Sequence, residues 1–226
     1  MPPLVHLRLR AVITDPDRLR ILCFGDSNTH GTPSDDPAYV RLPPDRRWTG
    51  LLQRLLGDGY DVIEEGLEWR TTDVDYEDNP GFNGRSYLVP CLLTHAPLDV
   101  VVIMLGSNDL QHFKRTPTAI ADALNGYIDD IVATTSARGG RVPMTVLVSP
   151  IWIDDTTSRM ASENFDPELA TRSRDLTTAI RSVAGRRGVL YADAARVARA
   201  GDDGVHLSLD SHARLAEHIA SVIVPG

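Results

Sequence analysis

Residues 21–31 have the sequence Ile-Leu-Cys-Phe-Gly-Asp-Ser-Asn-Thr-His-Gly, in which an apolar run meets a polar turn. The apolar part, residues 21–24, is typical of a buried strand, and the Gly-Asp-Ser turn places Ser27 just beyond the strand's end. In an open α/β sheet this edge is where ligands bind. Because a lone serine is a weak nucleophile, a catalytic Ser27 requires a base, an orienting acid and anion-stabilising donors elsewhere in the chain.

Further apolar runs predict strands that alternate with helices. The strongest covers residues 99–105, which are apolar without a break from Val100 onward and suit a parallel strand covered on both faces. Shorter runs predict strands at 61–63, 145–148 and 189–192. Spacing and end signals predict helices at 48–56, 86–93, 117–132, 167–184 and 210–223. The alternation indicates an α/β sandwich on a parallel sheet, with the carboxyl ends of the strands along one edge.

Residues 20–226 are expected to form a single domain, and residues 1–19 an N-terminal extension of it. Within the extension, residues 5–11 alternate apolar and polar side chains, a pattern that suits a half-buried strand. An added edge strand, an arm that reaches another subunit and a disordered extension all fit this pattern.

Composition narrows the classes of partner. The chain has 226 residues and a formal net charge of −8, which argues against broad binding to nucleic acid or to an anionic membrane surface. It has no apolar stretch near the roughly 20 residues that cross a bilayer, and charged residues interrupt its N-terminus, so we expect a cytoplasmic protein. Two cysteines cannot form a disulfide framework or a zinc site, and Cys23 is expected to pack in the core.

Two loops offer partners for Ser27. Asp203 and His206 lie three residues apart in a short loop that contains Gly204, so one turn could deliver a base and its orienting carboxylate. A surface turn with a solvated histidine would have the same sequence. The Asn108 amide could donate to a developing oxyanion, although an Asn-Asp turn that ends a strand is the alternative.

Gly-Asp-Ser, then Gly-x-Asn-Asp, then Asp-x-x-His occur in the order of the GDSL or SGNH hydrolases, a family that the chain resembles from Arg20 onward. The resemblance implies a flavodoxin-like three-layer α/β/α sandwich with a five-stranded parallel sheet, and ester hydrolysis through a serine acyl-enzyme. By motif, Ser27 would be the nucleophile, His206 the base and Asp203 the acid, in preference to Asp202. Asn108 and the Ser27 N–H would be oxyanion donors.

The family's second block usually supplies a further oxyanion N–H from a glycine after the second strand. Here the loop contains Gly66, but alignment on Arg70-Thr71-Thr72 puts Trp69 at the donor position, and Trp69 is the favoured candidate. A tryptophan there would narrow the acyl pocket.

A closer resemblance is to the arylesterase/acyltransferase branch of the family. It is carried by Arg-Trp-Thr-Gly at 47–50, Val-Ile-Glu-Glu-Gly at 62–66 and Thr-His-Ala-Pro-Leu-Asp at 94–99. Members act on short acyl esters and can pass the acyl group to alcohols or peroxide, and they often form oligomers. They usually carry Leu and Trp where this chain has Asn28 and His30, so the site mouth is expected to be more polar here.

The pattern therefore predicts a serine carboxylic ester hydrolase for small acetyl-type esters, with acyl transfer and homo-oligomer formation as open possibilities. Candidate substrate-binding residues are Asn28, His30, Trp69 and Trp152; for Trp152 core packing is an equal alternative. No metal or cofactor is expected, because zinc-type His spacing and phosphate-binding Gly-rich loops are missing from the sequence. The alternatives are a carbohydrate O-acetyl esterase and a non-catalytic flavodoxin-like module that binds an anion.

Overall fold

The computed structural model describes residues 18–35, 40–137, 139–157, 166 and 168–224. The strand predicted at residues 5–11 of the N-terminal extension lies outside these residues. Within them, five parallel strands form one sheet in the order β2-β1-β3-β4-β5. The strands are β1 (Leu19–Gly25), β2 (Tyr60–Gly66), β3 (Val100–Met104), β4 (Met144–Ser149) and β5 (Leu190–Asp193). The predicted three-layer fold with a five-stranded parallel sheet is confirmed.

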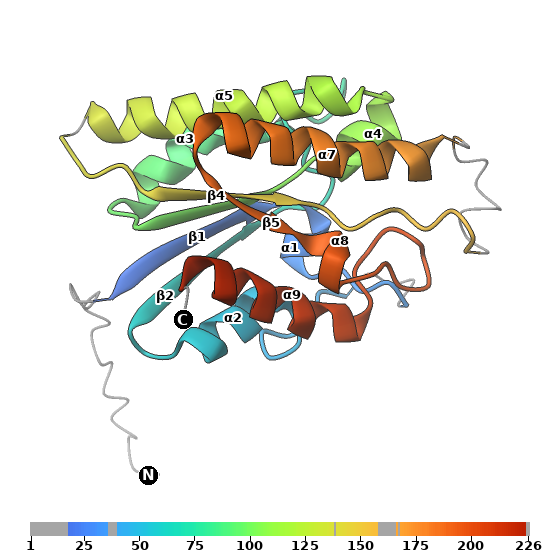
Figure 1. Cartoon of the computed structure of the whole chain (residues 1–226), viewed down its shortest axis with the longest axis horizontal. Helices are drawn as coiled ribbons and strands as arrows, with labels where there is room; N and C mark the ends of the chain where they lie inside the picture. The colour runs from blue at the N-terminus through green and yellow to red at the C-terminus, as the bar shows by residue number, and fades with distance from the viewer. Residues whose placement is uncertain (1–17, 36–39, 138, 158–165, 167, 225–226) are drawn as a thin grey trace, which may run out of the picture.

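Helices cover both faces of the sheet (Figure 1). One face carries α3 (Gly84–His95), α5 (Pro117–Ser136) and α7 (Leu169–Arg187). The opposite face carries α2 (Trp48–Leu56) and α9 (Leu209–Ile223). Alternate residues of one strand serve the two cores: Leu22 and Phe24 pack toward the first face, and Ile21 and Cys23 toward the second. Cys23 is fully buried, as predicted.

The structure also contains short helices that were not predicted. They are α1 (Ser27–His30), α4 (Ser107–Phe113), α8 (Ala194–Val197) and the 3₁₀ turn η1 (Pro80–Phe82). The longer helices all form, and two of them, α5 and α7, end about one turn beyond the predicted ends. In the described part of the chain, no helix has the length and apolar character that a bilayer crossing demands.

The chain leaves β1 toward β2 on one side and returns to β3 on the other side of β1. The carboxyl ends of β1 and β3 therefore border the topological switch point, where open α/β sheets form their binding crevice. Ser27 follows β1 directly, and Asn108 follows β3. The topology thus brings both candidate residues to one edge.

Two glycines allow α1 to lie tightly over this edge. A Cβ at Gly25 would lie 2.1 Å from Thr29 Oγ1, and a Cβ at Gly66 would lie 2.1 Å from the His30 backbone nitrogen. Both distances are far inside van der Waals contact. A larger residue at either position would push α1, and Ser27 with it, away from the sheet.

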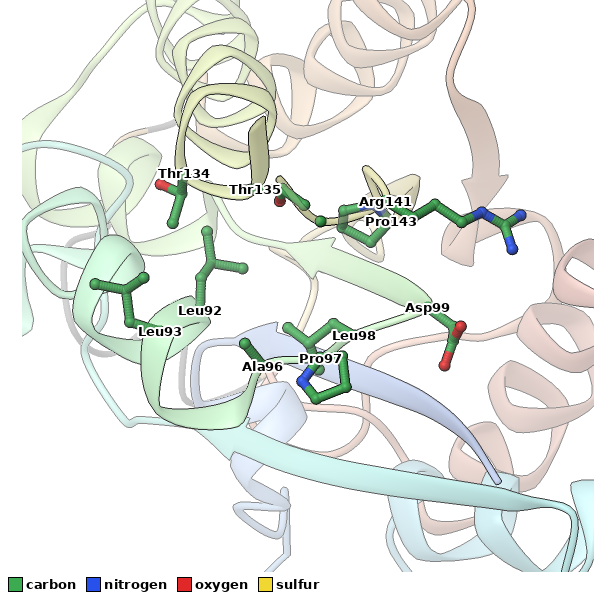
Figure 2. A pocket seen from close by; sticks show the side chains of 11 residues that line it. Leu92, Leu93, Ala96, Pro97, Leu98, Asp99, Thr134, Thr135, Arg141 and Pro143 are labelled. Atoms are coloured by element: carbon green, nitrogen blue, oxygen red, sulfur yellow. The ribbon is translucent and has the colours of Figure 1, made fainter. Parts of the chain in front are cut away.

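An apolar cavity of about 390 Å³ lies at the opposite, amino-terminal edge of the sheet (Figure 2). Its walls come from the carboxyl-terminal parts of α3 and α5, through Leu92 and Thr135, and from the entries to β3 and β4, through Leu98 and Pro143. Its position separates it from the edge that carries Ser27.

Candidate active site

Ser27 is the first residue of α1, immediately after the capping residue Asp26. The Asp26 carboxylate accepts a hydrogen bond from the Asn28 backbone N–H at 3.0 Å, which satisfies one of the free donors of the helix start. Ser27 is 8% exposed. A rigid turn at the sheet edge therefore holds the hydroxyl, which sits at the positive end of a short helix.

The loop before α9 brings Asp203 and His206 into direct contact. His206 Nδ1 lies 2.5 Å from Asp203 Oδ2, while Asp203 Oδ1 accepts the backbone N–H groups of Val205 at 2.9 Å and His206 at 2.8 Å. Burial raises the pKa of Asp203, but the hydrogen bonds and the charge of His206 outweigh burial and hold that pKa below its ordinary value. Asp203 is buried and Asp202 is exposed, so the geometry selects Asp203 as the partner of the imidazole.

Asn28 joins this loop to the nucleophile turn. Its Oδ1 accepts the Leu207 N–H at 2.8 Å, and its Nδ2 donates to the Val205 carbonyl at 3.3 Å. The contacts bracket His206 and link segments 179 residues apart in sequence. The structure differs here from the expectation of a substrate-binding Asn28, because the side chain is 3% exposed and both ends of its amide bond protein.

Asn108 lies at the start of α4, next to the loop that follows β2. Its Nδ2 donates to the Arg70 carbonyl at 3.0 Å, and the side chain is buried. This nitrogen carries two hydrogens, and among the described residues only the Arg70 carbonyl accepts one of them, so the other is available for an oxyanion. Asn108 thus both fixes the 67–72 loop and offers a donor.

Two further side chains fix that loop. The Arg70 guanidinium donates to the Gly25 carbonyl at 2.9 Å and to the Glu65 carbonyl, and it lies 4.2 Å from the centre of the Phe24 ring. Asp109 accepts from the Thr72 N–H at 2.9 Å and from its hydroxyl at 2.5 Å. No role was predicted for Arg70 or Asp109, although each directly adjoins a candidate site residue in the sequence.

The loop presents Trp69 in an uncommon backbone conformation. Its φ is 65°, in the left-handed region that non-glycine residues rarely adopt, and its side chain is 51% exposed. No described residue accepts a hydrogen bond from the Trp69 N–H. Gly66, by contrast, ends β2 beneath α1, where close packing accounts for its lack of a side chain. These features agree with Trp69 rather than Gly66 as the second-loop donor.

The other predicted pocket residues lie on separate elements. His30 ends α1 and is partly buried; its pKa is lowered by burial and by the charge of Arg41. The Trp152 ring is 39% exposed, and its Nε1 donates to Thr177 of α7 at 3.1 Å. Trp152 therefore packs on α7, whereas Trp69 lies 5.1 Å, centroid to centroid, from the ring of His112 on α4.

Asp26 is a second buried carboxyl group beside the base. Burial raises its pKa to about 6, although the Asn28 N–H and the charges of His206 and Arg70 act in the opposite direction. Its Oδ2 has no hydrogen-bond partner among the described residues. The nucleophile turn thus contains a buried carboxyl group whose pKa is raised to about 6.

Glu65, Cys91 and His95 form a cluster of side chains of the types that bind metal ions. Donor atoms of Glu65, Cys91 and His95 lie within 4.8 Å of one another, and zinc accepts such a set. However, Glu65 Oε1 is already bonded to His95 Nε2 at 2.7 Å, and burial raises the pKa of the Cys91 thiol to about 12. The nearby Arg70 adds positive charge. The contacts thus explain the cluster as a link between α3 and β2.

The fold and the arrangement of residues at the edge of its sheet define a class of protein. The model of the GDSL-like lipase/acylhydrolase family matches residues 23–214, and the chain belongs to this family. It is accordingly a carboxylic ester hydrolase of the SGNH type. Among curated proteins, none matches significantly.

Solved structures give more specific similarities. The native aryl esterase of M. smegmatis is 35% identical, with a TM-score of 0.84 over 91% of this chain and 98% of that chain. Est24, a carbohydrate acetylesterase from Sinorhizobium meliloti, is 33% identical, with a TM-score of 0.84 over 91% and 98%. A carbohydrate acetylesterase family member from the same organism is 29% identical, with a TM-score of 0.80 over 91% and 97%.

Proposed function

We propose that the chain hydrolyses short-chain, acetyl-type esters through an acyl-enzyme on Ser27. Asp203 holds the His206 ring through Nδ1, which leaves Nε2 to take the proton from the Ser27 hydroxyl as its oxygen attacks the ester carbonyl. His206 then gives this proton to the leaving alcohol. Water, deprotonated by the same imidazole, releases the acid and restores Ser27.

The negative charge on the carbonyl oxygen develops beside the donors of the switch-point crevice. The Ser27 N–H, the Trp69 N–H and the free hydrogen of Asn108 Nδ2 would stabilise it. Arg70 and Asp109 support this arrangement because their hydrogen bonds hold the 67–72 loop to the end of β1 and to α4. Fixed donors of this kind need no reorganisation as the charge forms.

The observation that carries the proposal is the tie between the two ends of the chain. The Asp203–His206 pair is formed at 2.5 Å, and Asn28 bonds the main chain on both sides of His206. These contacts support a site in which the Ser27 hydroxyl, the His206 imidazole and the Asp203 carboxylate act together.

The first substrate candidate is an aryl acetate. Its support is the half-exposed Trp69 beside His112, an aromatic surface next to the proposed donors, and the similarity to the M. smegmatis aryl esterase. Acyl transfer to an alcohol or peroxide would follow if that acceptor replaced water at the acyl-enzyme.

The second candidate substrate is an acetylated carbohydrate. The partly buried His30 gives the site a polar group, and Est24 matches the fold as well as the aryl esterase does. Both substrates use the same acyl-enzyme chemistry and differ in the leaving alcohol.

Hydrolysis of 4-nitrophenyl acetate by the wild type and by Ser27→Ala tests the proposed nucleophile. We expect turnover to vanish in Ser27→Ala and to persist in Ser221→Ala, a surface serine on α9. Equal turnover in the wild type and Ser27→Ala would refute the role of Ser27. Acetylated sugars, and an added alcohol or hydrogen peroxide, then rank the substrates and acceptors by kcat/KM.

A further inference from the structure

We infer that Asn28 positions the catalytic base by tying the loop that carries His206 to the turn that carries Ser27. This inference rests on the proposed function, in which His206 must meet the Ser27 hydroxyl. The tie consists of the Leu207 N–H bonded to Asn28 Oδ1 at 2.8 Å and Asn28 Nδ2 bonded to the Val205 carbonyl at 3.3 Å.

The loop also bonds within its own segment and to the segment that follows β4, where the Gly204 carbonyl accepts the Asp154 N–H at 2.9 Å. Asp203 Oδ1 accepts the N–H groups of Val205 and His206, and the His206 carbonyl accepts the Gly201 N–H at 2.8 Å. The bonds of Asp203 hold the imidazole and its carboxylate together, and the Asp154 bond joins the loop to the segment after β4. Asn28 supplies a direct link, one residue away from the proposed nucleophile.

The chemistry of the contact requires a carboxamide. At 3% exposure, the side chain must offer an acceptor to one peptide and a donor to another, which a neutral amide does without a buried charge. Leucine offers neither group. Aspartate keeps the acceptor for Leu207 but places a second oxygen against the Val205 carbonyl and a negative charge beside the base.

The effect should appear in the chemical step rather than in substrate binding. Both ends of the Asn28 amide bond protein, so its removal takes no contact away from an ester. A shift of about 1 Å between reacting groups can cost about 10²-fold in rate. We expect Asn28→Leu to lower kcat by about 10- to 100-fold while KM changes by less than about threefold.

Asn83→Leu is the matched control. Asn83 is also buried, at 8% exposure, and its carboxamide caps α3 by accepting from the Arg85 and Ser86 N–H groups. Both variants lose a carboxamide with two backbone contacts, and both should lose stability. Chemical denaturation measures that loss, and only Asn28→Leu should lower kcat in the fully folded protein.

Asn28→Asp provides a readout that a merely structural role would not move. A carboxylate beside the imidazole favours its protonated form. The acid limb of the kcat/KM profile should therefore move to higher pH in Asn28→Asp and stay in place in Asn83→Asp. An unmoved limb, or a wild-type kcat in folded Asn28→Leu, would overturn the inference.

Amide hydrogen exchange of Leu207, followed by NMR, reports the tie independently of turnover. Selective loss of Leu207 protection in Asn28→Leu supports the tie even if hydrolysis survives in Ser27→Ala and the proposed function fails. Unchanged Leu207 protection refutes the tie even if activity falls. The failure of the inference and that of the proposed function are therefore distinguishable.

Discussion

Asp203→Asn is the substitution whose effect follows most directly from the contacts. Asp203 Oδ1 accepts two backbone N–H groups, and Oδ2 accepts from His206 Nδ1 at 2.5 Å. Asparagine can keep the first oxygen in place, so the loop retains its two backbone bonds. Its amide nitrogen then faces Nδ1, which must become an acceptor, and the ring proton moves to Nε2.

An imidazole with its proton on Nε2 cannot take the proton of Ser27. In serine hydrolases with this arrangement the wrong tautomer costs about 10⁴-fold in kcat. We therefore expect Asp203→Asn to lower kcat by about 10³- to 10⁴-fold, which corresponds to about 4–5.5 kcal/mol of transition-state stabilisation. KM should change little, since Asp203 is buried and pairs with the base.

Steady-state hydrolysis of 4-nitrophenyl acetate at pH 8 measures this loss, and ¹⁵N chemical shifts of the His206 ring report its tautomer. Asp202→Asn is the control: it removes an exposed carboxylate from the adjacent position and should leave kcat within about twofold, as is usual for surface changes. An Asp203→Asn variant within tenfold of the wild-type kcat would refute the proposed role of Asp203.

Three further outcomes are expected. At saturating ester, Asn108→Ala should lower kcat by about 10²- to 10³-fold, because it removes a proposed oxyanion donor and the hydrogen bond to the Arg70 carbonyl. An unchanged kcat would exclude Asn108 as an oxyanion donor. Asp26→Asn should be more stable than the wild type at pH 8 by about 3 kcal/mol and equally stable at pH 4. The sign follows from a folded-state pKa raised to about 6, so that the wild-type fold loses stability as pH rises from about 4 through 6; equal unfolding free energies at pH 8 would contradict it. Burial lowers the pKa of His212 to about 4, so the wild type should lose about 3 kcal/mol of unfolding free energy as pH falls from 6.5 to 4. Urea titrations at pH 7 and pH 4 should show this loss in the wild type and not in His212→Gln. Equal losses in both proteins would contradict the prediction.

Much of the fold could be predicted because its central strands are continuous apolar runs. Residues 21–24 and 99–105 indicated buried parallel strands, and β1 and β3 lie side by side in the sheet. The end of β2 was harder to predict, since the edge strand continues through Glu64 and Glu65, two polar residues. The helix α4 was missed because its first turn, Ser-Asn-Asp, has the composition of a loop.

The site residues also differ in how far they could be predicted from the sequence. Asp203 and His206 could be proposed as a pair because they share one short loop and match the family's Asp-x-x-His motif, and the structure shows them in contact. The structural roles of Asn28 and Arg70 could not be predicted, because their hydrogen-bond partners are remote in the chain and a sequence pattern does not show which loops meet. From sequence alone, Asn28 is expected to be a polar residue at the mouth of the site, whereas in the structure its side chain accepts the Leu207 N–H.

Covalent labelling tests the central claim most directly. The protein is incubated with a fluorophosphonate, which phosphonylates an activated serine, and the adduct is located by intact mass and peptide mapping. We predict one adduct per chain, on Ser27, whose formation slows sharply in His206→Ala and disappears in Ser27→Ala. An adduct on another serine, or undiminished ester hydrolysis by a protein with Ser27 fully blocked, would contradict the account.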